Sequence, residues 1–472
     1  MPTTKKITPK TSTKKKITPK PIKRVVIKET DRTIKFSYIS LVIIFIIILL
    51  GGLYFYNFTY VSDDQEENEV TQVQEEKHVS FLLEIFDKIQ ENYWEVITEQ
   101  DLFNIYKAGL EKLEKQPEVI INNDRVALKS ILNQVIEGIS DNNAKKEFSV
   151  NLATIVLYNL QPVGRSGLFT TQKETDLWNN VKNIDPNTNL YTELGVTEDA
   201  STEEIIAAAD EVEEGLQDII DDSDSTEEEF AKAQQKLAVV DRARETLTQE
   251  AARETYNTSG VEATVYGEML TDEILHMTIK KMSPTSFTEL QQVANEFDQN
   301  QDLDTLILDL RGNIGGSVDL MPYFLGPFIG PNQYAYELYH QGEYEPYKTL
   351  VGWLPSLVRY KNVVILQDEV AQSSAEVMTS VLKKYNVGIL VGTTSRGWGT
   401  IEAVYELDNQ ISDDETYKMF LVNAVTLRDD GQPIEGRGVD PVINIADEDW
   451  DDQLFTYVND KTLVREVAKL ID

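Results

Sequence analysis

The sequence predicts an α/β core at its C-terminal end, preceded by a helical region and by a single transmembrane helix near the N-terminus. From Ile274 onward, short apolar β-rich runs alternate with helical stretches, which is typical of an α/β sheet whose site lies at the strand carboxyl ends. Between residues 79 and 187, apolar side chains recur at helical spacing. The run Ile39–Phe55 is almost wholly apolar and long enough to cross a bilayer as a helix.

The composition narrows the range of possible functions. The chain has 472 residues, no cysteine and three histidines, which excludes disulfides and cysteine-bound metal, and we expect no metal site and no cofactor. The net charge is −36 and residues 1–35 contribute +10, so the remainder carries −46. Because so acidic a body repels phosphate groups, we expect no nucleic-acid partner.

The N-terminal segments predict a membrane-anchored protein. Residues 1–35 contain KKITPK twice and have little to bury, which predicts a disordered basic tail. Residues 36–60 are the expected transmembrane anchor, and residues 61–78 form a polar stalk. Basic residues precede the anchor and acidic residues follow it, so we expect a cytoplasmic N-terminus and an extracytoplasmic bulk. A cleaved signal peptide is the alternative, but the long basic lead-in and the lack of a small-x-small cleavage site favour an uncleaved anchor.

Two helical units follow the stalk. Residues 79–187 are expected to form a mostly helical domain. Within residues 188–260, a capping box of Ser201 and Glu204 opens one amphipathic helix. A second box, Ser225 with Glu228, opens another, so the two helices should form an antiparallel hairpin joined by an acidic turn.

This hairpin resembles a J-domain, the co-chaperone module. LYTELGVTEDASTEEI is similar to the opening of that module and ARETLTQEAARETYN to its end. The diagnostic His-Pro-Asp is replaced by Gln217, Asp218 and Ile219, and residues 190–258 hold 20 acidic and 5 basic residues. Without the basic second helix that J-domains use, we expect no functional heat-shock chaperone partner.

Three motifs in the α/β region, residues 263–472, occur in a fixed order. LDTLILDLRGNIGG runs a buried strand into a glycine-rich turn, where backbone N–H groups can approach a carbonyl oxygen. VVILQDEVAQSSAEVMTSVLKKY is a strand, a short turn and a helix. LVGTTSRGWGTIEAVYEL comes next, and GQPIEGRGVDPVINI closes the set. Taken singly, a glycine pair indicates only a turn and a serine before a helix only a cap.

Together these motifs resemble the C-terminal processing (tail-specific) serine peptidase family. The resemblance implies a crotonase/ClpP-like sheet and a polypeptide substrate. It implies Ser373 as the nucleophile, three residues before Glu376. It also implies an oxyanion hole made by the backbone N–H groups of Gly315, Gly316 and Ser374.

The resemblance fails at the general base. The family has a lysine between two glycines, 25 residues after the serine, and this position is Trp398. The family's supporting glutamine, four residues further on, is Glu402. An indole N–H donates a hydrogen bond but has no basic lone pair. Lys280 and Lys281, at the end of the first core strand, are the alternative base, although a solvated strand end is the simpler interpretation of both.

Three functions therefore remain open for a protein of the cell envelope. The first is a pseudopeptidase that binds polypeptides or protein partners without efficient hydrolysis. The second is an active serine endopeptidase with a relocated base. The third is an adaptor that acts through the acidic hairpin, which occupies the slot where this family usually carries a PDZ domain.

Overall fold

The computed structural model describes residues 76–115, 122–222, 225–428 and 430–471. The predicted basic tail, the predicted anchor at residues 36–60 and nearly all of the predicted stalk lie outside the described residues. Among the residues that are described, no helix combines the length and the apolar character needed to span a bilayer.

A six-stranded sheet forms the centre of the C-terminal part, in the order β11-β8-β7-β4-β3-β2. All neighbours are parallel except β2, which pairs antiparallel with β3. Asp309 of β4 lies opposite Leu366 of β7, so these two central strands end at the same edge of the sheet. The strands are β2 (Val265–Thr271), β3 (Ile274–Ile279), β4 (Thr305–Asp309), β7 (Asn362–Gln367), β8 (Ile389–Gly392) and β11 (Ile443–Asn444).

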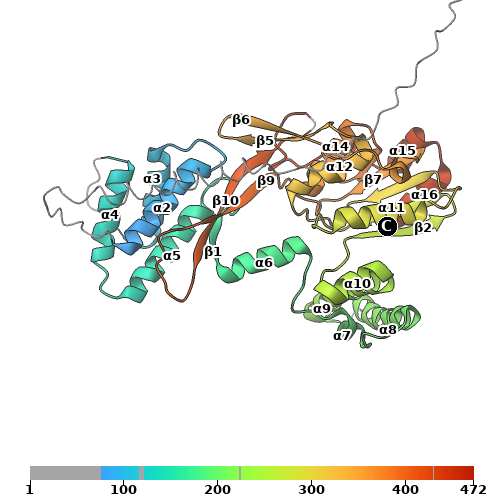
Figure 1. Ribbon diagram of the computed structural model, residues 1–472, viewed down its shortest axis with the longest axis horizontal. Helices are drawn as coiled ribbons and strands as arrows, with labels where there is room; N and C mark the ends of the chain where they lie inside the picture. The colour runs from blue at the N-terminus through green and yellow to red at the C-terminus, as the bar shows by residue number, and fades with distance from the viewer. Residues whose placement is uncertain (1–75, 116–121, 223–224, 429, 472) are drawn as a thin grey trace, which may run out of the picture. The chain divides into compact units, whose positions relative to one another are not determined.

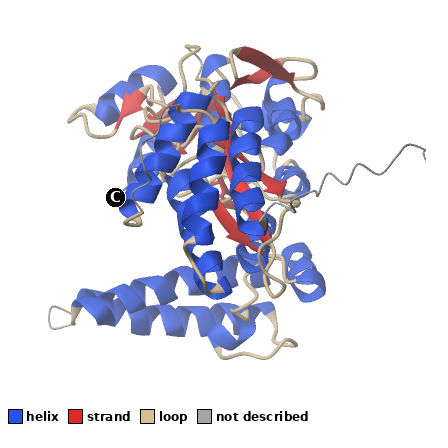
Figure 2. Ribbon diagram, turned by 90° about the vertical axis from the view of Figure 1, so that its left-hand side faces the viewer, coloured by secondary structure: helices blue, strands red, loops and turns tan. Residues whose placement is uncertain are grey.

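Helices cover both faces of this sheet, and the strand residues alternate between them as the pleat requires. Leu306 and Leu308 pack with one set of helices, whereas Ile307 between them packs with the other. Figures 1 and 2 show helices packed around the strands. The first face carries α11 (Ser286–Phe297), α12 (Met321–Ile329) with the short η1 (Val318–Leu320), α13 (Pro355–Val358) and α14 (Ser374–Lys384), and the second carries α15 (Trp450–Val458) and α16 (Lys461–Ile471).

A second, antiparallel sheet connects the C-terminal part to the helical region. It has the order β1-β10-β5-β6, and β9 also pairs with β10. Leu168 of β1 lies opposite Met419 of β10, although the two residues are far apart in sequence. The strands are β1 (Gly167–Thr170), β5 (Tyr334–His340), β6 (Glu343–Lys348), β9 (Thr400–Glu406) and β10 (Tyr417–Thr426).

The helical region does not have a core of its own. Phe86, Leu102 and Leu152 are fully buried and belong to the same apolar cluster as Met419 and Leu421 of β10. Residues 79–187 therefore share their interior with a long hairpin of the C-terminal part. The helices are α2 (Lys77–Asn92), α3 (Glu99–Lys112), α4 (Arg125–Glu137), α5 (Asn142–Tyr158) and, after β1, α6 (Thr171–Lys182).

The insertion, residues 188–260, is a separate helical unit with a small core of its own. Ile205 and Val240, one from each long helix, are both fully buried and belong to the same apolar cluster. Figure 2 shows the long helices lying side by side. The strand-like ends of the insertion meet in a bridge between Ile184 and Val261. The helices are α7 (Leu190–Leu194), α8 (Thr202–Asp221), α9 (Glu227–Thr248) and α10 (Glu250–Ser259).

One capping box of this insertion differs from the prediction. Ser201 and Glu204 exchange both expected hydrogen bonds at the start of α8. The second box is formed by Thr226 and Glu229, not by Ser225 and Glu228. Ser225 and Thr226 are adjacent hydroxyl residues followed by three glutamates, so the sequence offers two registers, and the helix begins one residue later than predicted.

Candidate active site

Ser373 occupies a sharp turn between β7 and α14. Its backbone has φ +58° and ψ −127°, a conformation that residues other than glycine rarely adopt. Such strained positions gather at functional sites, where the surrounding structure holds them. The turn presents Ser373 at the carboxyl edge of the sheet, beside the glycine-rich loop that comes after β4.

Gly315 of that loop lies directly against the serine. A Cβ atom at Gly315 would lie 2.7 Å from Cβ of Ser373, closer than real atoms approach, and φ of Gly315 is +84°. The amide of Gln372 also donates to the carbonyl of Asn313 at 3.0 Å, which joins the two loops. Glycine is therefore required at position 315 for both conformation and space.

The three predicted oxyanion donors are not equivalent. The amide of Gly315 donates to Oδ1 of Asn313 at 2.8 Å and is already engaged. The amides of Gly316 and Ser374 donate to no acceptor within the part of the chain that the structure describes. Two of the three N–H groups thus have no acceptor among the described residues.

A buried carboxylate connects the serine to the loop that carries residue 398. Glu376 is fully buried, and its Oε2 accepts from the amides of Ser373 at 2.9 Å and Trp398 at 2.8 Å. Its Oε1 accepts from the amide of Gly397 at 2.7 Å and from the hydroxyl of Ser395 at 2.6 Å. Burial raises the pKa of Glu376 although these four bonds favour the ionised form. The shared oxygen fixes residues 373 and 398 as close neighbours.

Trp398 forms a side-chain hydrogen bond with residue 402. Its Nε1 donates to Oε1 of Glu402 at 3.3 Å, and the hydroxyl of Thr400 donates to the same oxygen at 2.6 Å. Burial raises the pKa of Glu402, and the bonds from Thr400 and Trp398 oppose that rise. The indole thus uses its single polar group on Glu402 and has none to offer Ser373.

A cation covers the face of the indole. The guanidinium carbon of Arg165 lies 3.3 Å from the Trp398 ring centroid, and that of Arg396 lies at 5.5 Å. Arg165 also pairs with Glu435 at 3.1 Å, and the other Glu435 oxygen accepts from the amide of Gly399 at 2.9 Å. Position 398, where the resemblance implies an amine, therefore holds an aromatic ring, and the permanently charged guanidinium of Arg165 covers that ring.

Sequence reasoning missed Arg165, Glu435 and the role of Glu376. Arg165 precedes β1, in a segment far from the peptidase motifs, and nothing in its surroundings marks it. Glu435 lies in the closing motif GQPIEGRGVDPVINI, which indicates that the segment belongs to the core but does not distinguish the glutamate from its neighbours. The Ser-x-x-Glu spacing of Ser373 and Glu376 was a usable signal, since it is the spacing of a capping box.

The alternative bases, Lys280 and Lys281, do not contact Ser373. Nζ of Lys280 lies 4.0 Å from Oε1 of Glu245 on α9. Lys281 is 9% exposed and lines a different cavity, beside Arg242 and Glu262. No basic side chain or carboxylate of the described residues hydrogen-bonds to the Ser373 hydroxyl. The structure therefore gives the relocated-base hypothesis no contact on which to rest.

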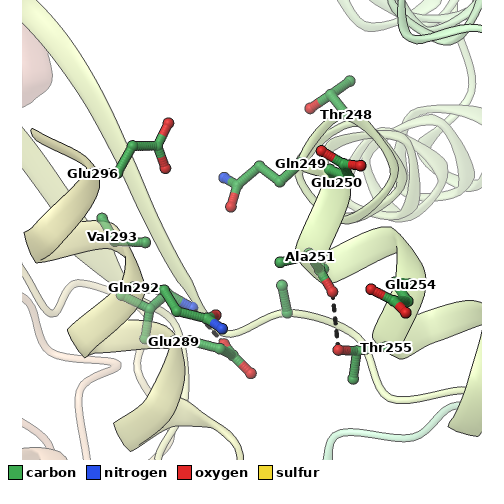
Figure 3. Close-up of a pocket in the computed structure, with 13 residues that line it drawn as sticks. Thr248, Gln249, Glu250, Ala251, Glu254, Thr255, Glu289, Gln292, Val293 and Glu296 are labelled. Carbon is green, nitrogen blue, oxygen red and sulfur yellow. Dashed lines mark hydrogen bonds between the residues drawn. The ribbon is translucent and has the colours of Figure 1, made fainter.

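A second cavity, of about 540 Å³, lies between α10 and α11 and is shown in Figure 3. Its lining includes small apolar side chains such as Ala251 and Val293. Gln249 reaches from the start of α10 toward the side of α11, where Glu296 lies. Four glutamates and no basic residue line the cavity: Glu250, Glu254, Glu289 and Glu296.

Comparison with known proteins agrees with the resemblance drawn from the motifs. Residues 273–445 match peptidase family S41. A carboxy-terminal processing protease of Bacillus subtilis is 29% identical over 188 residues, which cover 40% of this chain and 38% of that protein. The chloroplastic carboxyl-terminal-processing peptidase 3 of Arabidopsis thaliana is 28% identical over 138 residues, 28% of this chain and 25% of that protein. The chain therefore matches well under two thirds of the length of these relatives.

Solved structures of similar proteins include the photosystem II D1 C-terminal processing protease. It is 16% identical, with a TM-score of 0.33, and the match covers 39% of this chain and 49% of that one. A lipoprotein from Streptococcus agalactiae is 17% identical with a TM-score of 0.32, covering 55% of this chain and 96% of that one. From the family match and the relatives in sequence, residues 273–445 form a core that matches peptidase family S41 and is similar in sequence to C-terminal processing proteases.

Proposed function

We propose that the protein is a membrane-anchored, extracytoplasmic pseudopeptidase that binds polypeptides without efficient hydrolysis. The observation that carries the proposal is Trp398, whose N–H donates to Glu402 and whose face is covered by Arg165. A serine hydroxyl needs an adjacent base to become a competent nucleophile. Loss of general-base assistance lowers the rate by about 10²–10⁴, and loss of one member of a coupled catalytic unit by up to ~10⁶.

Retention of a polypeptide site is supported by the groups around Ser373. The amides of Gly316 and Ser374 have no acceptor among the described residues and could bind a carbonyl oxygen. Two apolar side chains of the same loops are exposed, Ile314 at 39% and Val370 at 43%. Unpaired N–H groups beside exposed apolar surface suit an extended polypeptide, which brings both carbonyl groups and side chains.

Membrane attachment is supported by the apolar run within residues 36–60 and its charged flanks. Protein expressed in full should sediment with membranes and resist extraction by carbonate. A version beginning at residue 63 should stay in the supernatant. Equal behaviour of the two versions would remove the anchor from the proposal.

Hydrolysis is tested directly with β-casein and a fluorogenic peptide. We expect the wild type and Ser373→Ala to show the same background rate. Turnover by the wild type that is abolished in Ser373→Ala would refute the pseudopeptidase. Binding should survive in both proteins, measured as a change in anisotropy of a labelled, unfolded casein fragment.

A gain-of-function variant tests the same assignment from the other side. Trp398→Lys combined with Glu402→Gln restores the residue types that the family resemblance implies. We expect Ser373-dependent cleavage to appear, because Glu376 holds position 398 beside Ser373 through backbone bonds that do not depend on the side chain at 398. The matched control is Trp398→Met with Glu402→Gln, which removes the ring without adding a base and should stay inactive.

The cavity of Figure 3 favours a second candidate function, an adaptor that holds a basic polypeptide at the insertion. Glutamates rim small apolar side chains there, an environment suited to the aliphatic stem and charged head of lysine or arginine. A labelled lysine-rich peptide should bind the wild type and bind Glu250→Gln/Glu296→Gln more weakly, with the loss greatest at low salt. Unchanged binding by the double variant would exclude this site.

A further inference from the structure

Lys281, which makes no hydrogen bond to Ser373, lines a separate polar cavity of about 330 Å³. The next residue, Met282, donates through its amide to the carbonyl of Gly315, so Lys281 is adjacent in sequence to a residue that contacts the glycine-rich loop. The cavity is bounded by the end of α6, the segment before α7, α9 and the segment before β2. Its polar lining includes the amides of Asn179, Asn180 and Asn187.

The charged groups that face Lys281 come from every element around the cavity. They are Asp176 on α6, Asp185 before α7, Arg242 on α9 and Glu262 before β2. Arg242 lies 3.5 Å from a carboxylate oxygen of Asp185 and 3.3 Å from Oε2 of Glu262. The arginine therefore uses the nearby carboxylates and remains a fixed positive charge beside the lysine.

The ammonium group of Lys281 has no such partner. Within the described ranges, it makes neither a hydrogen bond nor an ion pair, although the residue is only 9% exposed. Oε1 of the buried Glu262 likewise has no hydrogen-bond partner. A charged side chain with so little exposure and no partner is costly as a structural element.

The surroundings favour the neutral amine form of this lysine. Burial, assisted by the positive charge of Arg242 and opposed by Glu262, lowers the pKa of Lys281 to about 8. At pH 7 roughly a tenth of such side chains are neutral amines, against about one in 3,000 for an ordinary lysine. Desolvation beside a second cation is a known way to activate a lysine toward carbonyl carbon.

We propose that Lys281 is a covalent binding site, where the amine forms a reversible Schiff base with a small polar aldehyde held by the asparagine amides of this cavity. The lone pair of Nζ attacks the carbonyl carbon, and the amine proton passes to the carbonyl oxygen to give a carbinolamine. Loss of water, which carries away that oxygen, leaves the imine. No oxidant or reductant is needed. The small cavity excludes large substrates, and its amides can hydrogen-bond hydroxyl groups.

The test uses the full chain, glyceraldehyde and cyanoborohydride, which traps the imine as a stable amine. Peptide mapping by mass spectrometry then gives a labelling rate for each lysine. Lys280 is the internal control, because it is the adjacent residue but its side chain is 51% exposed. We expect Lys281 to react at least about tenfold faster than Lys280 at pH 7, with a rate that levels off above pH 8. A rate at or below that of Lys280 overturns the proposal.

Two substitutions in the same cavity should act in opposite directions. Arg242→Gln removes the charge that disfavours the ammonium, so labelling of Lys281 at pH 7 should slow several-fold. Glu262→Gln removes the charge that favours the ammonium, so labelling should accelerate. Melting curves identify a variant that has failed to fold. A folded pair that shifts in the same direction, or not at all, contradicts the electrostatic basis of the site.

Discussion

Trp398 and Glu402 form a hydrogen-bonded pair at the two positions where the family resemblance implies a lysine and a glutamine. The indole N–H donates to Oε1 of Glu402 at 3.3 Å. The indole has no basic lone pair, and Glu402 carries a negative charge when it is ionised. Arg165 compensates that charge, since it lies on the indole and lowers the cost of ionising Glu402.

The Arg165–Trp398 contact predicts a spectroscopic signal. Arg165→Ala should expose the ring, shift tryptophan emission to longer wavelength and cost about 1–2 kcal/mol of stability. Arg396→Ala is the matched control, because its guanidinium lies 5.5 Å from the ring on an exposed residue, and its effect should be smaller. In a Trp398→Phe background the shift should vanish. A shift that persists there would assign the signal to another tryptophan.

Two glycines of one loop allow the cost of backbone strain to be distinguished from the cost of a steric clash. Gly312 and Gly315 both have positive φ, +68° and +84°, but a Cβ at Gly312 would meet nothing within 4 Å. Gly312→Ala should therefore cost about 1–2 kcal/mol from conformation alone. Gly315→Ala should cost roughly 2 kcal/mol more, because its Cβ collides with Ser373. Urea unfolding measures both values, and equal losses would contradict the close approach.

At the scale of elements, α9 meets the β2–β3 pair through charged residues. Glu245 on α9 lies 4.0 Å from Lys280 and near Glu268 and His276 of the two strands. Burial raises the pKa of Glu245 to about 7, against an ordinary value of 4.5. The insertion is therefore attached to the core through a group that titrates near neutral pH.

This contact predicts a stability that falls as pH rises. Between pH 4.5 and 7 the folded protein retains a proton on Glu245 that the unfolded chain has released, so folding is favoured most below this window. The contribution, at most about 3 kcal/mol, is lost once pH passes 7. Glu245→Gln should be more stable than the wild type at pH 8 and similar at pH 4. Urea unfolding at both values tests this, and Glu250→Gln, an exposed change on α10, should show no such difference.

Elements set by local periodicity could be predicted from the sequence, whereas features that depend on distant contacts were missed. The strand Ile274–Ile279 was predicted with the bounds of β3, because a short run rich in apolar and β-branched residues indicates a buried strand. The α/β class and the helical N-terminal region were confirmed. The pairing of β1 with β10 and the position of Arg165 over Trp398 were missed, because both join segments more than 200 residues apart.

At the scale of the molecule, the apolar clusters of the described residues differ in whether they are shared between regions or lie within one region. The helical region and β10 share one apolar cluster, so neither can be removed without exposing the other. The insertion has its own cluster, built only from residues between Leu190 and Tyr256. Its ends are held together by the bridge of Ile184 with Val261. The insertion is therefore attached to the core but contributes no residue to the apolar clusters of the core.

Excision of the insertion tests this division. Residues 186–260 replaced by a short Gly-Ser linker should leave the remainder folded with one cooperative transition, because the bridge already holds the ends together and the lost ion pairs are worth ~1 kcal/mol each. Deletion of residues 99–158, which contribute to the shared cluster, should instead give an unfolded or aggregated protein. Near-UV circular dichroism and calorimetry distinguish the two. Collapse of the first variant would show that the insertion supports the core.

The four hydrogen bonds of Glu376 have a consequence for substitution at position 398. They position the serine turn and the neighbouring loop through backbone amides and one hydroxyl, so the shape of the site does not depend on which side chain stands at position 398. Position 398 should therefore accept side chains of different chemistry, an amine as well as an indole, without unfolding the protein. A carboxylate at the start of a helix in this way separates the shape of the site from the chemistry of the side chain placed in it.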